Sequence, residues 1–266
     1  LGPGGLPASP IQRADGSAVR LVGQVPGGLA GAGAVELNGN VYVIGGGSVP
    51  PAGNGAVVGG PGAPVSRAIL KVPVTGAGTA AAAGQLPTGV TGAAVAAVGG
   101  TAFVVGGYDG SRELDGVLAW QPGGAVHRTA HLPGRLRFAA AASSGGRVIV
   151  AGGSTGGIPT RDILRFDPGT HRVSRIGQLP VPLSHAGAAS LGGLVFVIGG
   201  RGAGTGSVTR AIYAIDPETG AARFAGALPV GLMDPAVAAV GSRILVAGGT
   251  DQSGKVEDGV LAVSPR

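Results

Sequence analysis

The chain has 266 residues, of which 56 are glycine and 20 are proline, while 44% are hydrophobic and only 12% are charged. Abundant Gly and Pro are common in low-complexity sequence, but a disordered chain would be less apolar and more charged, so this composition predicts many short strands joined by tight turns. The lack of cysteine excludes disulfides, thiolate metal sites and a cysteine nucleophile, and the net charge of +6 comes from scattered arginines that form no nucleic-acid-binding stripe.

The first predicted strand covers residues 17–26, which are mostly apolar and end in proline. Because the chain starts at Leu1 rather than at methionine, we expect a signal peptide or membrane anchor upstream and an extracytoplasmic protein. The most apolar stretch, residues 90–105, contains three glycines and is shorter than the roughly 20 residues of a membrane-spanning helix. A hairpin of two buried strands is expected there.

Five repeated units follow, and in each unit 19 residues separate a proline from the first glycine of a pair. The glycine pairs follow β-branched runs at intervals of 61, 46, 47 and 49 residues. The prolines are Pro26, Pro87, Pro133, Pro180 and Pro229, and the first glycines are Gly45, Gly106, Gly152, Gly199 and Gly248. Such constant spacing indicates a repeat architecture.

Each unit predicts four strands. Between the proline and the glycine pair, two apolar runs flank a short glycine turn such as Gly99-Gly100, which is the pattern of a β-hairpin. Residues 115–122 are then nearly repeated in residues 258–265, and the internal copies continue into a fourth strand that ends in Leu-Pro. Four strands in a unit of this length are typical of a propeller blade.

We therefore predict an all-β fold, a five-bladed β-propeller with four-stranded antiparallel blades in a single domain of residues 1–266. The fifth unit has three strands of its own, and residues 17–26 resemble the fourth strand of the third unit, so the N-terminal strand is expected to complete the last blade and remove exposed sheet edges. The predicted blades are residues 27–87, 88–133, 134–180, 181–229, and 230–266 with 17–26.

Two motifs resemble the Kelch repeat family over nearly the whole chain: the double glycine, and the Asp-Pro turn at residues 166–168 and 215–217. The resemblance implies a propeller, although the family more often has six or seven blades and a tryptophan in the fourth strand. Seven residues before each proline, the tryptophan column holds Val19, Ala80, Val126, Val173 and Ala222. The first strands consist mostly of Ala, Gly and Ser, and small residues allow the closer packing that five blades require.

The resemblance also implies where ligands bind, because fourth-to-first and second-to-third connections emerge on one face of such propellers. Five residues after each proline the sequence has Gly31, Gly92, Phe138, His185 and Asp234. Together with Arg135 and Arg137, the last three predict a site for an anionic or sugar-like ligand. The alternative interpretation is that His185 and Asp234 only satisfy backbone groups at the starts of strands.

The connections after the glycine pairs supply further candidates, although several of them also fit ordinary turns. They are Tyr108, Asp109, Arg112, Ser154, Arg201, Asp251 and Lys255. The connection at residues 47–66 is about a dozen residues longer than its counterparts, and we expect Val57 and Val58 to cover the site or contact a partner.

We expect a monomeric, non-catalytic binding or sensor module for a protein or carbohydrate ligand, with no cofactor, no metal and no nucleic acid. The alternative is a carbohydrate-active enzyme, similar to a sugar mutarotase or a glycosidase, with its site at the channel mouth. A glycosidase would need two convergent carboxylates. The near-match to a phosphate-binding loop at residues 249–256 has Val256 where Ser or Thr is required, so it is rejected.

Overall fold

The computed structural model describes residues 9–15, 18–25, 29–48, 64–74, 78–204 and 206–264. These residues form two compact units, an N-terminal unit (residues 1–128) and a C-terminal unit (residues 129–266). Their regular structure consists of β-strands, and they include no helix long and apolar enough to cross a membrane. Val57 and Val58, predicted to cover the site, lie outside the described residues.

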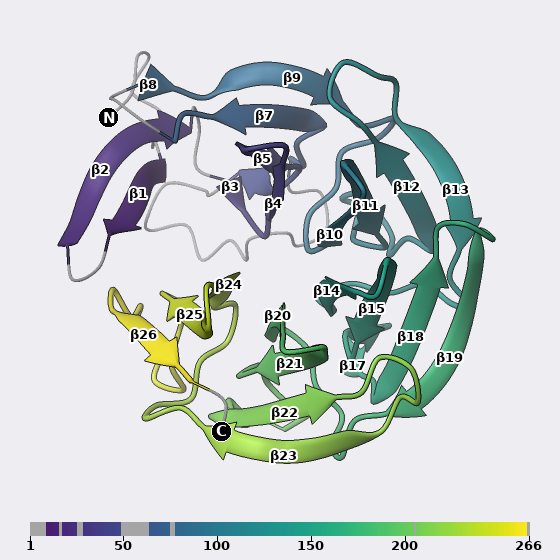
Figure 1. The fold of residues 1–266 in the computed structure, drawn as a ribbon, viewed down its shortest axis with the longest axis vertical. Coiled ribbons are helices and arrows are strands. Elements are labelled where there is room, and N and C mark those ends of the chain that lie inside the picture. The colour runs from purple at the N-terminus through teal and green to yellow at the C-terminus, as the bar shows by residue number, and fades with distance from the viewer. Residues whose placement is uncertain are drawn as a thin grey trace. The chain divides into compact units, whose positions relative to one another are not determined.

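The N-terminal unit contains a complete four-stranded antiparallel sheet in the order β4-β5-β7-β9 (Figure 1). Its strands are β4 (Gly33–Leu37), β5 (Asn40–Ile44), β7 (Ala68–Val72) and β9 (Ala81–Gln85). The next sheet has the order β10-β11-β12-β13, and its last strand runs into the first residues of the C-terminal unit. These strands are β10 (Ala94–Val98), β11 (Thr101–Val105), β12 (Gly116–Trp120) and β13 (His127–His131).

The C-terminal unit contains two further sheets of four strands, β14-β15-β18-β19 and β20-β21-β22-β23. The first consists of β14 (Ala140–Ser144), β15 (Arg147–Ala151), β18 (Asp162–Asp167) and β19 (Arg172–Gln178). The second consists of β20 (Gly187–Leu191), β21 (Leu194–Ile198), β22 (Ala211–Ile215) and β23 (Ala222–Ala227). The last described sheet has the order β24-β25-β26, with β24 (Ala236–Val240), β25 (Arg243–Ala247) and β26 (Val260–Val263). With this sheet the fold class is the predicted five-bladed β-propeller.

The expected pairing of residues 17–26 with the last blade would join the two units, and it stays a prediction. The described chain has β2 (Ala18–Val25) hydrogen-bonded to β1 (Ser9–Asp15) along its length and to β8 (Gly78–Thr79) at two residues. The described strands of the last sheet are β24, β25 and β26. The sequence did not predict β1, whose hairpin with β2 joins adjacent segments at a low cost in loop-closure entropy.

Turns that contain glycine set the register of the first two strands in the blades. In the β10–β11 hairpin, Val98 faces Thr101 across Gly99 and Gly100, whose φ angles are 55° and 77°. Positive φ at both central residues matches the right-handed twist of the strands, which is why such turns favour glycine. The predicted hairpin in residues 90–105 is therefore confirmed.

The double glycines fit tightly against the following sheet. A Cβ atom on Gly152 would lie 2.2 Å from the carbonyl oxygen of Leu183, and the N–H of Gly153 donates to that oxygen at 2.8 Å. The same bond joins Gly200 to Leu232 at 2.7 Å. In the N-terminal unit it joins Gly46 to Val90 at 2.7 Å. The pair is thus required because the backbone of one blade approaches that of the next.

The cores are apolar, and side chains of the predicted β-branched strands contribute to them. In the N-terminal unit, Trp120 on β12 is fully buried and packs edge-on against Tyr42, with ring centroids 5.0 Å apart. A Cβ on Gly84 of β9 would lie 3.0 Å from the indole nitrogen of Trp120. The large aromatic side chain therefore lies on the third strand of one sheet, opposite a glycine in the fourth strand of the preceding sheet.

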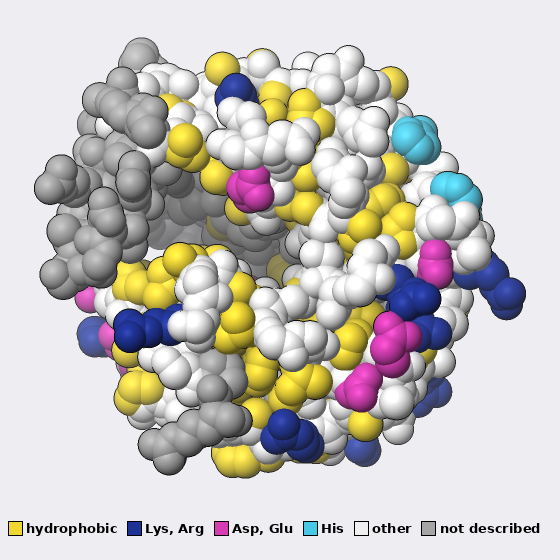
Figure 2. All heavy atoms as spheres, viewed as in Figure 1, with side chains coloured by type: hydrophobic (Ala, Val, Ile, Leu, Met, Phe, Trp, Pro, Cys, Tyr) yellow, Lys and Arg dark blue, Asp and Glu magenta, His cyan; other side chains and the backbone are white. Residues whose placement is uncertain are grey.

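Ion pairs join the edges of two sheets in the C-terminal unit. Arg147 contacts Asp167 at 3.3 Å and Glu218, in the turn after β22, at 2.8 Å. Figure 2 shows acidic and basic side chains intermingled on the viewed face. Because these groups are partly or largely exposed, each pair contributes at most about 1 kcal/mol.

We predict that Gly152→Ala lowers the free energy of unfolding much more than Gly156→Ala. Both glycines have φ near 60°, so alanine is strained at either position by roughly 1–2 kcal/mol. A methyl group on Gly156 would have no heavy atom within 4 Å, whereas one on Gly152 would face the Leu183 carbonyl, which should add about 1–3 kcal/mol. Urea unfolding of both variants measures the difference, and equal losses would contradict the close-approach explanation.

Candidate functional site

Three of the predicted ligand-binding residues occupy equivalent places in successive blades of the C-terminal unit. Phe138, His185 and Asp234 lie just before the first strands and have φ angles of 54°, 57° and 54°. The N–H of His185 donates to the carbonyl of Phe138 at 2.9 Å, and the N–H of Asp234 donates to that of His185 at 2.8 Å. We call this series of main-chain bonds the inner ladder.

The N-terminal unit has the same backbone arrangement with glycine in place of side chains. Gly31 and Gly92 have φ angles of 64° and 62°, and the N–H of Gly92 donates to the carbonyl of Gly31 at 2.8 Å. Left-handed backbone costs a non-glycine residue roughly 1–2 kcal/mol. The C-terminal unit therefore carries three side chains at positions whose conformation favours glycine, and such strain is typical of functional sites.

The side chains at these positions form a continuous row. The guanidinium carbon of Arg137 lies 5.0 Å from the centroid of the Phe138 ring. That ring stacks on the imidazole of His185, with centroids 3.9 Å apart and planes 23° apart. The Nδ1 atom of His185 lies 2.9 and 3.0 Å from the two carboxylate oxygens of Asp234. The structure thus brings together four of the residues singled out in the sequence.

Exposure differs along the row. The side chain of His185 is 17% exposed and that of Asp234 is 59% exposed. Since Nδ1 faces the carboxylate, Nε2 is the ring nitrogen that His185 can offer to a ligand. The alternative interpretation, in which His185 and Asp234 only satisfy backbone groups, does not describe their side chains, because these bond to each other.

Short β-bridges fix the backbone next to the row. The residue before each position of the inner ladder pairs, through two main-chain hydrogen bonds, with the residue that follows the glycine pair of the same blade. The bridges in the C-terminal unit are Arg137 with Ser154, Ser184 with Arg201, and Met233 with Thr250. The two sets of connections predicted to share one face are therefore joined residue by residue in this unit.

Two other predicted residues have different surroundings. Arg135 is exposed and lines a small cavity of about 70 Å³ together with Thr160 and Asp162. Tyr108, in the N-terminal unit, is only 6% exposed, so its side chain belongs to the interior of that unit.

Asp109 is chiefly a turn residue. Burial would raise the pKa of its carboxyl, but hydrogen bonds from the Ser111 hydroxyl and from the N–H groups of Arg112 and Ser111, together with the charge of Arg112, outweigh burial and hold the pKa below its ordinary value. The Arg112 guanidinium lies 3.6 Å from this carboxylate. The Asp109 carboxylate is therefore paired with Arg112 and hydrogen-bonded within its own loop.

Asp251 forms the same kind of turn in the C-terminal unit. Its Oδ1 atom accepts hydrogen bonds from the hydroxyl and the N–H of Ser253 and from the N–H of Lys255, and these bonds lower the pKa of the carboxyl. The Lys255 ammonium group instead contacts Glu257 at 2.9 Å.

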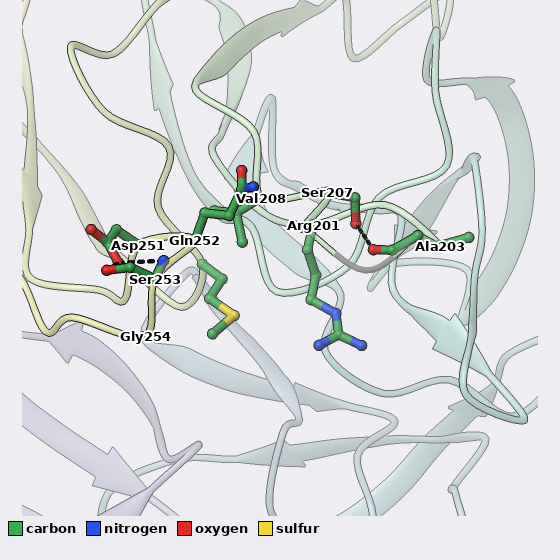
Figure 3. A pocket seen from close by; sticks show the side chains of 11 residues that line it. Arg201, Ala203, Ser207, Val208, Asp251, Gln252, Ser253 and Gly254 are labelled. Carbon is green, nitrogen blue, oxygen red and sulfur yellow. Dashed lines mark hydrogen bonds between the residues drawn. The ribbon is translucent and has the colours of Figure 1, made fainter.

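Arg201 and Asp251 also line one groove of about 410 Å³ between the connections after the glycine pairs of blades four and five (Figure 3). Sequence reasoning selected these two residues but missed others that line the groove, among them Ser207, Val208 and Gln252. No spacing signal marks these three, because they face the groove only through the packing of one loop on the other. The described residues include no group of three or more potential metal ligands placed to hold an ion.

The sheets and the ladder together define the class: a five-bladed β-propeller that displays polar and aromatic side chains on loops joined by main-chain hydrogen bonds. Kelch motifs match residues 90–124, 135–180 and 182–221. These three stretches therefore carry the Kelch motif that the glycine pairs predicted.

A solved structure supports the fold independently. The protein described as "Structure of YjhT" is 15% identical, superimposes with a TM-score of 0.75, and the match covers 93% of this chain and 85% of that one. At this identity the likeness concerns the fold alone. No curated protein sequence matches the chain significantly.

We predict that the free energy of unfolding of the Asp234→Gly variant exceeds that of the Asp234→Ala variant by about 1 kcal/mol. Both changes remove the carboxylate, but only alanine keeps a Cβ on left-handed backbone. At the exposed position Ala238 of β24 the order should be reversed, since glycine weakens an ordinary strand by roughly 0.5–1 kcal/mol. Urea denaturation of these variants checks both signs. If alanine is preferred over glycine at position 234, the backbone there is not strained.

Proposed function

We propose that this propeller is a non-catalytic binding module whose ligand rests on the row formed by Arg137, Phe138, His185 and Asp234. The observation that carries the proposal is the retention of three side chains on left-handed backbone, where glycine occupies the equivalent positions of the N-terminal unit. Side chains kept at a cost to stability are more readily explained by a ligand than by packing.

The chemistry of the row favours a carbohydrate over a protein surface. It offers a guanidinium group, an aromatic ring, an imidazole nitrogen and a carboxylate within one series of contacts. Such a series can exchange hydrogen bonds with several hydroxyl groups, while the aromatic ring accommodates C–H groups of a sugar. Asp234, the more exposed of the two bonded partners, is the group that we expect to meet the ligand first.

The proposal predicts that Asp234→Asn weakens saccharide binding about tenfold, because hydrogen bonds to a charged acceptor are about twice as strong as neutral ones. Glucose, galactose, N-acetylglucosamine and glucuronate are suitable probes, screened by saturation-transfer NMR and measured by calorimetry. Asp216→Asn is the matched control, because Asp216 accepts bonds only within the turn after β22 and should leave binding unchanged.

Three outcomes separate the possibilities. Binding that is weakened by Asp234→Asn and unaffected by Asp216→Asn supports the proposal. Binding that is equally sensitive to both variants, or that no probe shows, contradicts a saccharide site on the row. Binding of a purified protein that is lost in Asp234→Asn would place a protein ligand there instead.

One observation favours an enzyme as the second candidate. His185 is held by the Asp234 carboxylate at 2.9 Å, an arrangement in which imidazole can act as a general acid and base. A sugar mutarotase needs only such proton transfer: the hydroxyl proton on the anomeric carbon is removed as the ring C–O bond breaks, the ring oxygen is protonated, and the reverse steps close the ring on the other face.

The enzyme candidate predicts that the wild-type protein accelerates the change in optical rotation of freshly dissolved α-D-glucose or α-D-galactose, and that His185→Ala removes at least about 100-fold of the acceleration, the usual contribution of general acid–base catalysis. Polarimetry in weak buffer measures the rate. Acceleration that survives in His185→Ala would exclude this pair as its source.

A further inference from the structure

The groove lined by Arg201 and Asp251 lies apart from the row, since none of Phe138, His185 and Asp234 lines it. Its volume of about 410 Å³ falls within the range of small-molecule sites, roughly 300–1,000 Å³. One wall is formed by residues 201, 203, 204 and 206–208 of blade four, and the other by residues 251–254 of blade five. The two walls meet where a Cβ on Gly206 would lie 2.9 Å from the Gln252 amide nitrogen.

The positive group of the groove belongs to Arg201. Its backbone is fixed by two hydrogen bonds to Ser184, of 2.8 and 2.9 Å, while the residue as a whole is exposed. Among the described residues none forms an ion pair with the Arg201 guanidinium. This distinguishes Arg201 from Arg112 and Arg147, each of which has a carboxylate partner. A planar guanidinium with free donors is well suited to a ligand carboxylate.

The negative group belongs to Asp251, which is anchored through one oxygen only. Oδ1 takes the bonds from Ser253 and Lys255 that shape the turn, and these bonds keep the carboxylate ionised by lowering its pKa. The nearest basic side chain in its loop, Lys255, contacts Glu257. Oδ2 is thus the oxygen that can accept a bond from a ligand without loss of the turn.

The space between the two charges is partly apolar. Figure 3 shows Asp251 and Arg201 on opposite sides of the pocket, with Gln252 and Val208 between them. Val208 and Met233 line the groove as well, and both are partly exposed. A ligand that spans the groove would therefore meet a carboxylate, an amide and aliphatic groups, and a guanidinium in turn.

We propose that this groove binds a small zwitterion of the amino-acid or dipeptide class, with its ammonium group at Asp251, its carboxylate at Arg201 and its aliphatic part against Val208 and Met233. Opposite charges that line one groove without pairing with each other are complementary to a ligand that carries both charges. The proposal does not depend on a carbohydrate binding to the row.

Glycyl-leucine is the probe that fits this description, since it has both charges and one aliphatic side chain. Calorimetry should show that Asp251→Asn and Arg201→Gln each weaken its binding about tenfold, the loss expected for one charge-assisted bond. Asparagine keeps the Oδ1 acceptor, so the turn should remain folded. The same changes in the N-terminal unit, Asp109→Asn and Arg112→Gln, are matched controls that should leave binding unchanged.

Capped peptides test which charge meets which residue. N-acetyl-glycyl-leucine lacks the ammonium group, so it should bind wild type and Asp251→Asn equally and still lose about tenfold in Arg201→Gln. Glycyl-leucine amide lacks the carboxylate, so it should bind wild type and Arg201→Gln equally and remain sensitive to Asp251→Asn.

Other results would overturn the proposal. These are absence of glycyl-leucine binding to the folded wild type, binding that is indifferent to both variants, or equal sensitivity of both capped peptides to both variants. His185→Ala separates the two sites: it should abolish saccharide binding to the row and leave glycyl-leucine binding intact, so either site can fail while the other stands.

Discussion

The fold depends on one repeated hydrogen bond, which runs from the N–H of the second glycine of a pair to a carbonyl in the following blade and is seen for three of the pairs in the described chain. It is seen from Gly153 to Leu183 and from Gly200 to Leu232. The carbonyl comes so close that the preceding glycine, such as Gly152, has no room for a Cβ. Because a buried carbonyl needs its partner, this contact fixes the spacing of neighbouring blades and positions the loops that carry the candidate sites.

The ladder of Phe138, His185 and Asp234 follows from that spacing. Once adjacent blades are held at hydrogen-bonding distance, the residues that enter the first strands can bond to one another through the main chain. The resulting backbone is left-handed and suits glycine. If the row binds a ligand as proposed, stability and binding make opposite demands at these positions, because the bound side chains occupy backbone that suits glycine.

The repeat could be predicted from the sequence because glycine and proline mark it at constant spacing, and the hairpin turns, blade limits and Kelch resemblance all derive from those marks. The hairpin of β1 with β2 was not predicted, because β1 carries no repeat signal. The row was predicted as a column of positions, but the stacking of its rings and the hydrogen bond between His185 and Asp234 depend on three-dimensional geometry. Arg201 and Asp251 of the groove were predicted as candidates, but the groove itself was not, since residues such as Val208 and Gln252 become neighbours only through loop packing.

The inner ladder has a practical consequence, because it consists of main-chain atoms alone. Any exchange of residues 138, 185 and 234, other than to proline at 185 or 234, keeps every bond of the ladder. Their side chains are at least partly exposed and contact one another, so changing all three together alters one connected patch. The C-terminal blades could therefore serve as a scaffold for a combinatorial library. Randomising three codons would vary the patch while the main-chain bonds beneath it remain.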